Sequence, residues 1–133
     1  MKEVNYELAQ EILQAMVKHY GRSKYFDFIP NISISDDDSV LSGEWRSDWE
    51  EIVLYTPHFD NIPIRYIAEE MATVIAHEYC HYLQSPTWLT RYSKMYDYYE
   101  NPYELQAYKF EDSWRDIPEI AKLVNNHLEN AVH

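Results

Sequence analysis

Several kinds of residue are scarce in this sequence, and each shortage excludes a class of protein. The 133 residues include a single cysteine, Cys80, so the chain cannot form an intramolecular disulfide. The start of the chain, residues 1–14, has no apolar run with the length of a signal-peptide core or of a membrane-spanning helix. We therefore expect a reduced, cytoplasmic protein with no membrane partner.

Basic residues are also scarce. The chain has 11 Lys and Arg residues against 23 Asp and Glu residues, which gives a formal net charge of -12. Such a charge repels phosphate backbones and anionic lipid surfaces, and it attracts basic partners. The balance excludes an ordinary nucleic-acid binder.

Apolar residues are plentiful, because 46% of the chain is hydrophobic and 16% is aromatic. This composition can fill one core, and the length predicts a single domain over residues 1–133. Hydrophobic periodicity and helix-terminating residues predict four helices, over 4–20, over 64–84, and beginning at Pro102 and at Pro118. Residues 87–100 show no clear period, so we expect a loop with some helical turns there.

Between the first two helices the pattern favours short strands, over residues 31–35, 39–45 and 49–55. The acidic run at residues 36–38 is typical of a solvated turn, with a calcium site as the alternative. We expect an α+β fold in which a three-stranded antiparallel sheet packs on the central 64–84 helix, with three further helices around it. That helix is apolar around most of its circumference, which indicates that it is buried.

The central helix contains the spacing H-E-x-x-H, formed by His77, Glu78 and His81. The two histidines lie only about 40° apart on a helix surface, so both imidazoles can reach one ion. Glu78 lies on the flank of that face, where it cannot bind the ion but can take a proton from a water molecule that the ion activates. Structural histidines are the alternative, but three polar groups in an apolar helix would then be costly and without purpose. The motif predicts a Zn²⁺ site.

A catalytic zinc site needs a third protein ligand. The extended metzincin motif is excluded, because Gln84 stands in place of its glycine and Thr87 in place of its third histidine. Glu104, one turn into the next helix, is the favoured ligand, and the small Ala107 would let the two helices approach closely. Other downstream residues also stay open as ligands: Glu100, Glu111, Asp112 and His127.

Glu104 also has an alternative role without a metal. It follows Asn101 by three positions, which is the spacing of a capping box at a helix start. Cys80 lies near the histidines and could bind metal, but a small buried hydrophobic role is favoured.

These motifs together resemble the gluzincin-type zinc metallopeptidases, in particular the small minigluzincins and ImmA/IrrE-like domains. The resemblance rests on the H-E-x-x-H segment with Gln84 and on Asn101-Pro102-Tyr103-Glu104 with Ala107, and it covers about residues 62–112. It implies a zincin-like fold with an edge strand over the zinc, for which residues 51–55 are the candidate. An extended peptide would then bind along Ile52, Val53 and Leu54. No His or Tyr that would polarise the substrate carbonyl is evident.

The predicted function is zinc-dependent hydrolysis of a peptide or protein substrate. His77, His81 and Glu104 hold the ion, and Glu78 is the general base that passes a proton to the leaving amine. The alternative is an acidic binding or decoy protein, whose zinc site would be structural or catalytically silent.

Overall fold

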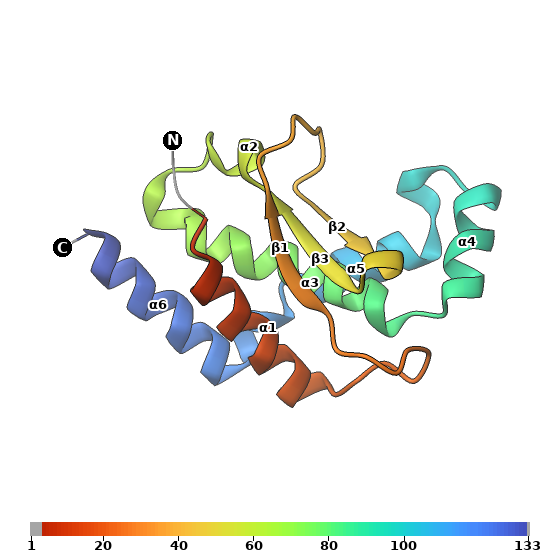
Figure 1. Cartoon of the computed structure of the whole chain (residues 1–133), viewed down its shortest axis with the longest axis horizontal. Helices are drawn as coiled ribbons and strands as arrows, with labels where there is room; N and C mark the ends of the chain where they lie inside the picture. The colour runs from red at the N-terminus through yellow and green to blue at the C-terminus, as the bar shows by residue number, and fades with distance from the viewer. Residues whose placement is uncertain (1–3, 133) are drawn as a thin grey trace.

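The computed structural model describes residues 4–132, with side chains as far as His127, and has an α+β fold (Figure 1). This fold class is the predicted one. The helices are α1 Tyr6–Tyr20, α2 Thr56–Phe59, α3 Ile67–Leu83, α4 Pro86–Met95, α5 Pro102–Phe110 and α6 Pro118–Val132. The strands are β1 Asn31–Ser35, β2 Gly43–Arg46 and β3 Glu51–Tyr55, and short 3-10 turns precede α3, α5 and α6.

The first helix, α1, ends at Tyr20 as the sequence predicts and begins at Tyr6, two residues later than predicted, and both of its ends carry a cap. The Asn5 side chain accepts a hydrogen bond from the Leu8 backbone N–H at 2.9 Å. Gly21 ends the helix with φ 85, a conformation that glycine adopts without strain. The Tyr79 hydroxyl of α3 donates to the Gly21 carbonyl, so this helix end is tied directly to the central helix.

The three strands form one mixed sheet in the order β1-β3-β2. Ile52 of β3 lies opposite Ile32 in a parallel pair and opposite Trp45 in an antiparallel pair. The prediction of a purely antiparallel sheet is therefore wrong for β1. Residues 47–50 form the short link of a hairpin between β2 and β3, and such a link requires antiparallel strands. The longer segment 36–42 joins β1 to β2 across the end of the sheet and leaves room for β3 between them.

The central position of β3 also corrects the predicted peptide-binding strand. Ile52, Val53 and Leu54 pair with strands on both sides and are buried, so they have no free edge to offer a peptide. Their unbroken apolar run is typical of a strand covered on both faces, and it could have identified the central strand from the sequence. The edge strand that packs against α3 is β2.

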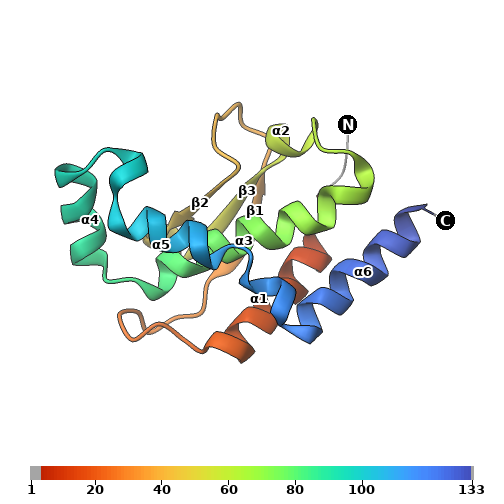
Figure 2. The same ribbon diagram turned by 180° about the vertical axis from the view of Figure 1, so that it is seen from behind.

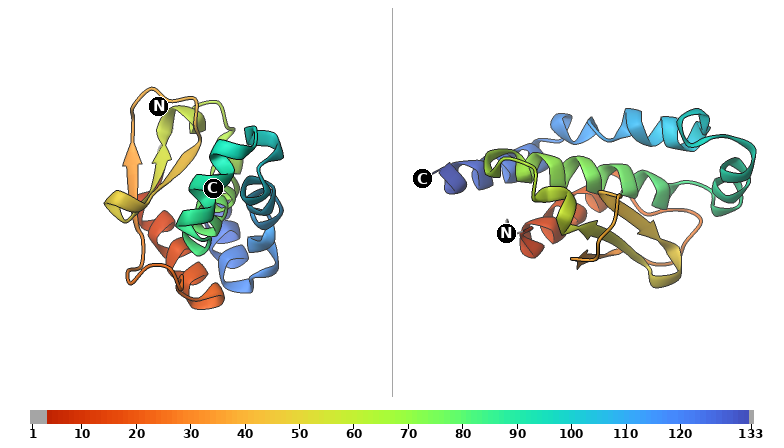
Figure 3. Two further views of the ribbon diagram at one scale, coloured as in Figure 1. Left: turned by 90° about the vertical axis from the view of Figure 1, so that its right-hand side faces the viewer. Right: turned by 90° about the horizontal axis from the view of Figure 1, so that it is seen from above.

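The central helix α3 lies between the sheet and α5, as the views from behind and from above show (Figures 2 and 3). Its approach to β2 depends on Gly43, where an added Cβ atom would lie 2.5 Å from Val74 Cγ1 and 2.9 Å from the Val53 carbonyl oxygen. Large apolar side chains of α3 fill the core, among them Met71, Ile75, Tyr79 and Tyr82. Of the helices described, α3 included, none is long and apolar enough to cross a membrane.

Residues 86–95 form a helix, α4, where the sequence analysis expected a loop with helical turns. The Ser85 side chain caps this helix by accepting from the Trp88 N–H, and Pro86 occupies its first turn. No residue of α4 is buried, which is why the usual apolar stripe is missing. Aromatic rings one turn apart support it instead, since Trp88 contacts Tyr92 and Tyr92 contacts Tyr96.

Candidate metal centre

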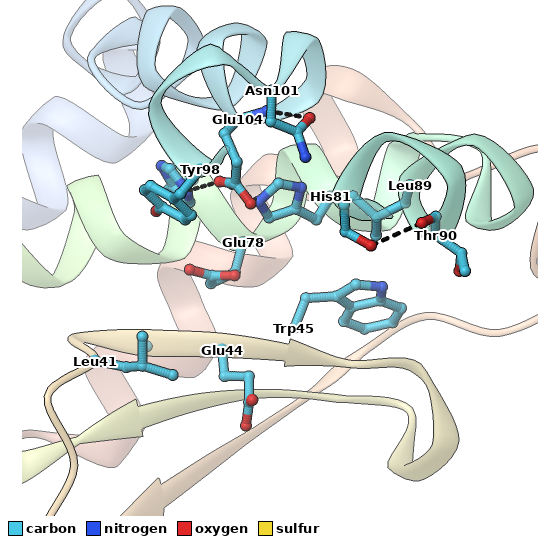
Figure 4. Close-up of a pocket in the computed structure, with 13 residues that line it drawn as sticks. Leu41, Glu44, Trp45, Glu78, His81, Leu89, Thr90, Tyr98, Asn101 and Glu104 are labelled. Carbon is cyan, nitrogen blue, oxygen red and sulfur yellow. Dashed lines mark hydrogen bonds and ion pairs between the residues drawn. The ribbon is translucent and has the colours of Figure 1, made fainter. Parts of the chain in front are cut away.

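The H-E-x-x-H segment of α3 opens into a cleft of about 320 Å³ (Figure 4). The edge strand β2 forms one wall, α4 forms another, and the start of α5 closes the side opposite the sheet. The cleft therefore lies over the face of α3 that the sequence predicts to bind a metal. The residues that line it include Leu41, Gly43, Trp45, His77, Glu78, His81, Leu89, Thr90, Ser93, Tyr98, Asn101 and Glu104.

Two histidines and one glutamate converge at the floor of this cleft. Glu104 Oε1 lies 3.2 Å from His77 Nε2 and 3.1 Å from His81 Nε2. Atoms bound to one tetrahedral zinc ion at its usual ligand distances are separated by about 3.3 Å, so the observed spacing fits a shared ion. All three ligand atoms lie within 4.8 Å of one another, and no other group of metal-ligating side chains converges in this way among the described residues.

The outer nitrogen of each imidazole is also held. His77 Nδ1 lies 2.9 Å from Glu111 Oε2, and His81 Nδ1 lies 2.7 Å from Gln84 Oε1. Both partners accept hydrogen bonds at these atoms, so each ring carries its proton on Nδ1 and directs Nε2 toward Glu104. Contacts of this kind orient histidine ligands around a metal.

These contacts test whether a metal fits the site. All four ring nitrogens face an oxygen acceptor, so protons alone satisfy them only if both imidazoles are cations. The ring centroids are 5.2 Å apart, and two buried cations at that distance repel each other. A divalent cation between the Nε2 atoms and Glu104 satisfies the same contacts with both rings neutral. The arrangement therefore fits a metal ion as well as it fits two protonated rings whose charge is offset by Glu78, Glu104 and Glu111.

The electrostatics of the three groups follow from this convergence. Burial lowers the pKa of His77, but the hydrogen bond to Glu104 and the nearby Glu78 and Glu111 outweigh it and raise the pKa to about 9. Burial raises the pKa of Glu104, but its contacts with His77 and His81 lower the value to about 2. The centre therefore holds a concentrated negative charge, which attracts either protons or a metal ion.

Glu78 occupies the position that the motif predicts for it. Its side chain is 8% exposed, and it is not one of the three groups whose ligand atoms converge. Figure 4 shows its carboxylate between α3 and β2, on the flank of the cleft. Burial raises its pKa, while the histidines and the backbone amide of Trp45 lower it less strongly. A carboxylate with a raised pKa beside a cation site is suited to accept and return a proton.

The hydrogen bonds at the start of α5 distinguish between the two roles proposed for Glu104, as a metal ligand or as a capping-box residue. Asn101 Oδ1 caps the helix by accepting from the backbone N–H groups of Tyr103, at 2.9 Å, and Glu104, at 3.4 Å. The Asn101 N–H donates to the Tyr98 carbonyl instead of to the Glu104 carboxylate. The reciprocal half of a capping box is therefore not formed, and the Glu104 side chain is directed at the histidines (Figure 4).

The other candidate ligands lie outside the centre. Glu111 contacts the outer nitrogen of His77, and Asp112 pairs with Arg115. Neither Glu100 nor His127 joins the group that converges on one point among the described residues. Cys80 is buried, and burial raises the pKa of its thiol to about 12, which confirms the prediction of a small buried side chain.

The sequence analysis named Glu111 only as a possible ligand and Gln84 only in its comparisons with protein families, so it missed the supporting role of both, although their spacing indicates it. Gln84 follows His81 by three positions, and Glu111 follows Glu104 by seven, so each lies on the same helix face as a ligand. It also missed Trp45 and Leu89 as walls of the cleft, because their contribution depends on how β2 and α4 are placed.

Comparison with protein-family models, with curated proteins and with solved structures finds no match to this chain. The chemistry of the converging side chains therefore carries the functional argument by itself.

Proposed function

We propose that this protein is a zinc-dependent metallopeptidase of the gluzincin type. The observation that carries the proposal is the placement of Glu78 beside, and not within, a group of two histidines and a glutamate in an open cleft. A purely structural zinc site would have no need of an open side or of a flanking carboxylate. This combination supports hydrolysis over simple metal storage.

Zinc is the ion that the donor set favours. Two neutral imidazoles and one carboxylate are a common ligand set of catalytic zinc, whereas Mg²⁺ and Ca²⁺ prefer oxygen ligands. When bound by His77, His81 and Glu104, the ion would supply Lewis acidity, which lowers the pKa of a coordinated water and polarises a carbonyl.

Glu78 performs the proton transfers in this proposal. Its buried carboxylate accepts a proton from the attacking water and then delivers that proton to the amine that leaves.

The edge strand β2 is the surface that would orient an extended peptide, in place of the predicted β3. Tyr55 N–H donates to the Ser42 carbonyl at 3.1 Å, so Ser42 forms a hydrogen-bonded pair with β3. Because such pairs alternate along antiparallel strands, the backbone groups of Gly43 and Trp45 point away from β3. The Trp45 N–H already faces the Glu78 carboxylate, so a peptide could pair with the Gly43 groups and with the Trp45 carbonyl, regardless of its side chains.

The proposal is tested by changing Glu78→Gln and assaying the zinc-loaded protein on a diverse peptide library. We expect zinc content and melting temperature to stay close to those of the wild type while cleavage falls by about a hundredfold or more. Glu69→Gln is the matched control, since it makes the same change on α3 at a half-buried residue outside the cleft that pairs with Arg115.

Two outcomes would contradict the proposal. Zinc-loaded wild-type protein that cleaves no peptide or protein would favour the acidic binding protein instead. Full cleavage by the Glu78→Gln variant would exclude Glu78 as the general base.

A further inference from the structure

We propose that Gln84 is a positioning residue of the metal centre, which holds His81 in the ring orientation and tautomer that metal binding requires. This inference rests on the metal site of the proposed function. It concerns a residue outside the H-E-x-x-H motif that neither binds the ion nor lies within reach of a substrate. Gln84 follows the last residue of α3 and is only 5% exposed.

The orientation of the Gln84 amide is fixed by its partners. Its Nε2 donates to the Tyr103 carbonyl at 3.0 Å and to Gln106 Oε1 at 2.8 Å, and it lies 3.5 Å from Cys80 Sγ. A backbone carbonyl can only accept, so the NH₂ group must face Tyr103. The carbonyl end of the amide therefore faces the opposite direction, toward His81.

The tautomer of His81 follows from that orientation. Gln84 Oε1 lies 2.7 Å from His81 Nδ1 and can only accept there, so Nδ1 carries the proton. A neutral ring with its proton on Nδ1 has its lone pair on Nε2, and Nε2 is the atom that lies 3.1 Å from Glu104 Oε1. Without the amide, the ring could take the other tautomer or rotate, and each change would remove a lone pair from the site.

The same amide also positions the third ligand. Tyr103 and Gln106 belong to α5, the helix that carries Glu104. One side chain thus bonds at one end to a histidine of α3 and at the other end to the turn of α5 that presents the carboxylate. Gln84 thereby sets both the direction of His81 and the separation of the two ligand-bearing helices.

The test compares zinc affinity of the wild type and of Gln84→Met, measured by competition with a chromophoric chelator. Methionine has a similar volume but cannot form the three polar contacts, so packing is largely retained. We expect zinc affinity to fall by about tenfold to a hundredfold, as is typical when a supporting contact of a metal ligand is lost. Gln14→Met, the same change at an exposed site on α1, should leave zinc affinity unchanged.

A second measurement starts from the wild type, so its first result does not depend on a variant that folds. Long-range ¹H–¹⁵N correlation spectra of the zinc-loaded protein should show His81 bound through Nε2, with a slowly exchanging proton on Nδ1. In Gln84→Met the exchange of that proton should accelerate, which a residue that serves only packing would not cause.

The outcomes separate this inference from the proposed function. Wild-type protein that binds no zinc would overturn the metal site itself. Wild-type protein that binds zinc while Gln84→Met binds it equally well, or a spectrum with His81 bound through Nδ1, would overturn the role of Gln84 alone.

Discussion

The C-terminal half of α3 and the helix that follows it, α4, form two walls of the same cleft but are held in opposite ways. His77, Glu78 and His81 are each less than 9% exposed, and every ring nitrogen has an oxygen partner. In α4 no residue is buried, and the helix depends on the Ser85 cap and on contacts between aromatic rings.

The two helices therefore differ in role. The helix α3 carries the groups that would do the chemistry, and α4 shapes the opening of the cleft. The groups that would bind the ion are fixed by several contacts at once, so a change at any one of them should be felt in metal affinity. The outer wall depends on few and exposed contacts, each of which contributes little to stability. Metal binding should therefore depend strongly on α3 and weakly on α4.

The largest effect is expected for His77→Ala and His81→Ala. Each removes one of three protein ligands, and since zinc sites contribute about 10–16 kcal/mol in total, the loss should weaken zinc binding roughly a thousandfold. The measurement is a chelator competition on folded protein, with His58→Ala as the control because His58 lies in α2, away from the centre. Unchanged affinity in either variant would remove that histidine from the site.

A smaller but still large effect is expected for Glu104→Gln. Glutamine is a neutral and poorer metal ligand, so zinc affinity should fall by well over tenfold. The start of α5 should stay intact, because Asn101 supplies its cap. The melting temperature of the zinc-treated variant should accordingly fall to near the metal-free value, since a metal stabilises only the state that binds it. Unchanged zinc affinity would move the search for a third ligand to other residues.

The smallest effect is expected in α4, for Trp88→Ala. Trp88 is 43% exposed and its ring centroid lies 5.4 Å from that of Tyr92, so loss of the ring should lower the free energy of unfolding by about 1 kcal/mol or less. Zinc affinity should not change. The measurement is denaturant unfolding together with a zinc titration, and a large loss of zinc binding would show that α4 belongs to the metal centre after all.

The comparison of the two walls also explains what the sequence could predict. The face of α3 that carries the candidate metal ligands was predictable, because helical geometry alone places His77 and His81 on one side and Glu78 on its flank. Glu104 was one of several possible third ligands, since the packing of α5 on α3 depends on contacts between distant residues. The helix α4 could not be predicted from apolar periodicity, because it has no buried face.

The sheet, too, was only partly predictable from the sequence. The strands themselves were predicted within a few residues, but their order was not, since pairing depends on which connection crosses the sheet. The unbroken apolar run of β3 did contain the information that it is central, and giving that run more weight would have assigned the edge to β2.

The most direct test of the account is X-ray absorption spectroscopy on the purified wild-type protein after zinc is added to one equivalent. The account predicts one zinc per chain, bound by two imidazole nitrogens and by oxygen from Glu104 and solvent, with no sulfur ligand because Cys80 is not one of the groups that converge on the site. Folded protein that refuses zinc, or a zinc bound through sulfur, would contradict it.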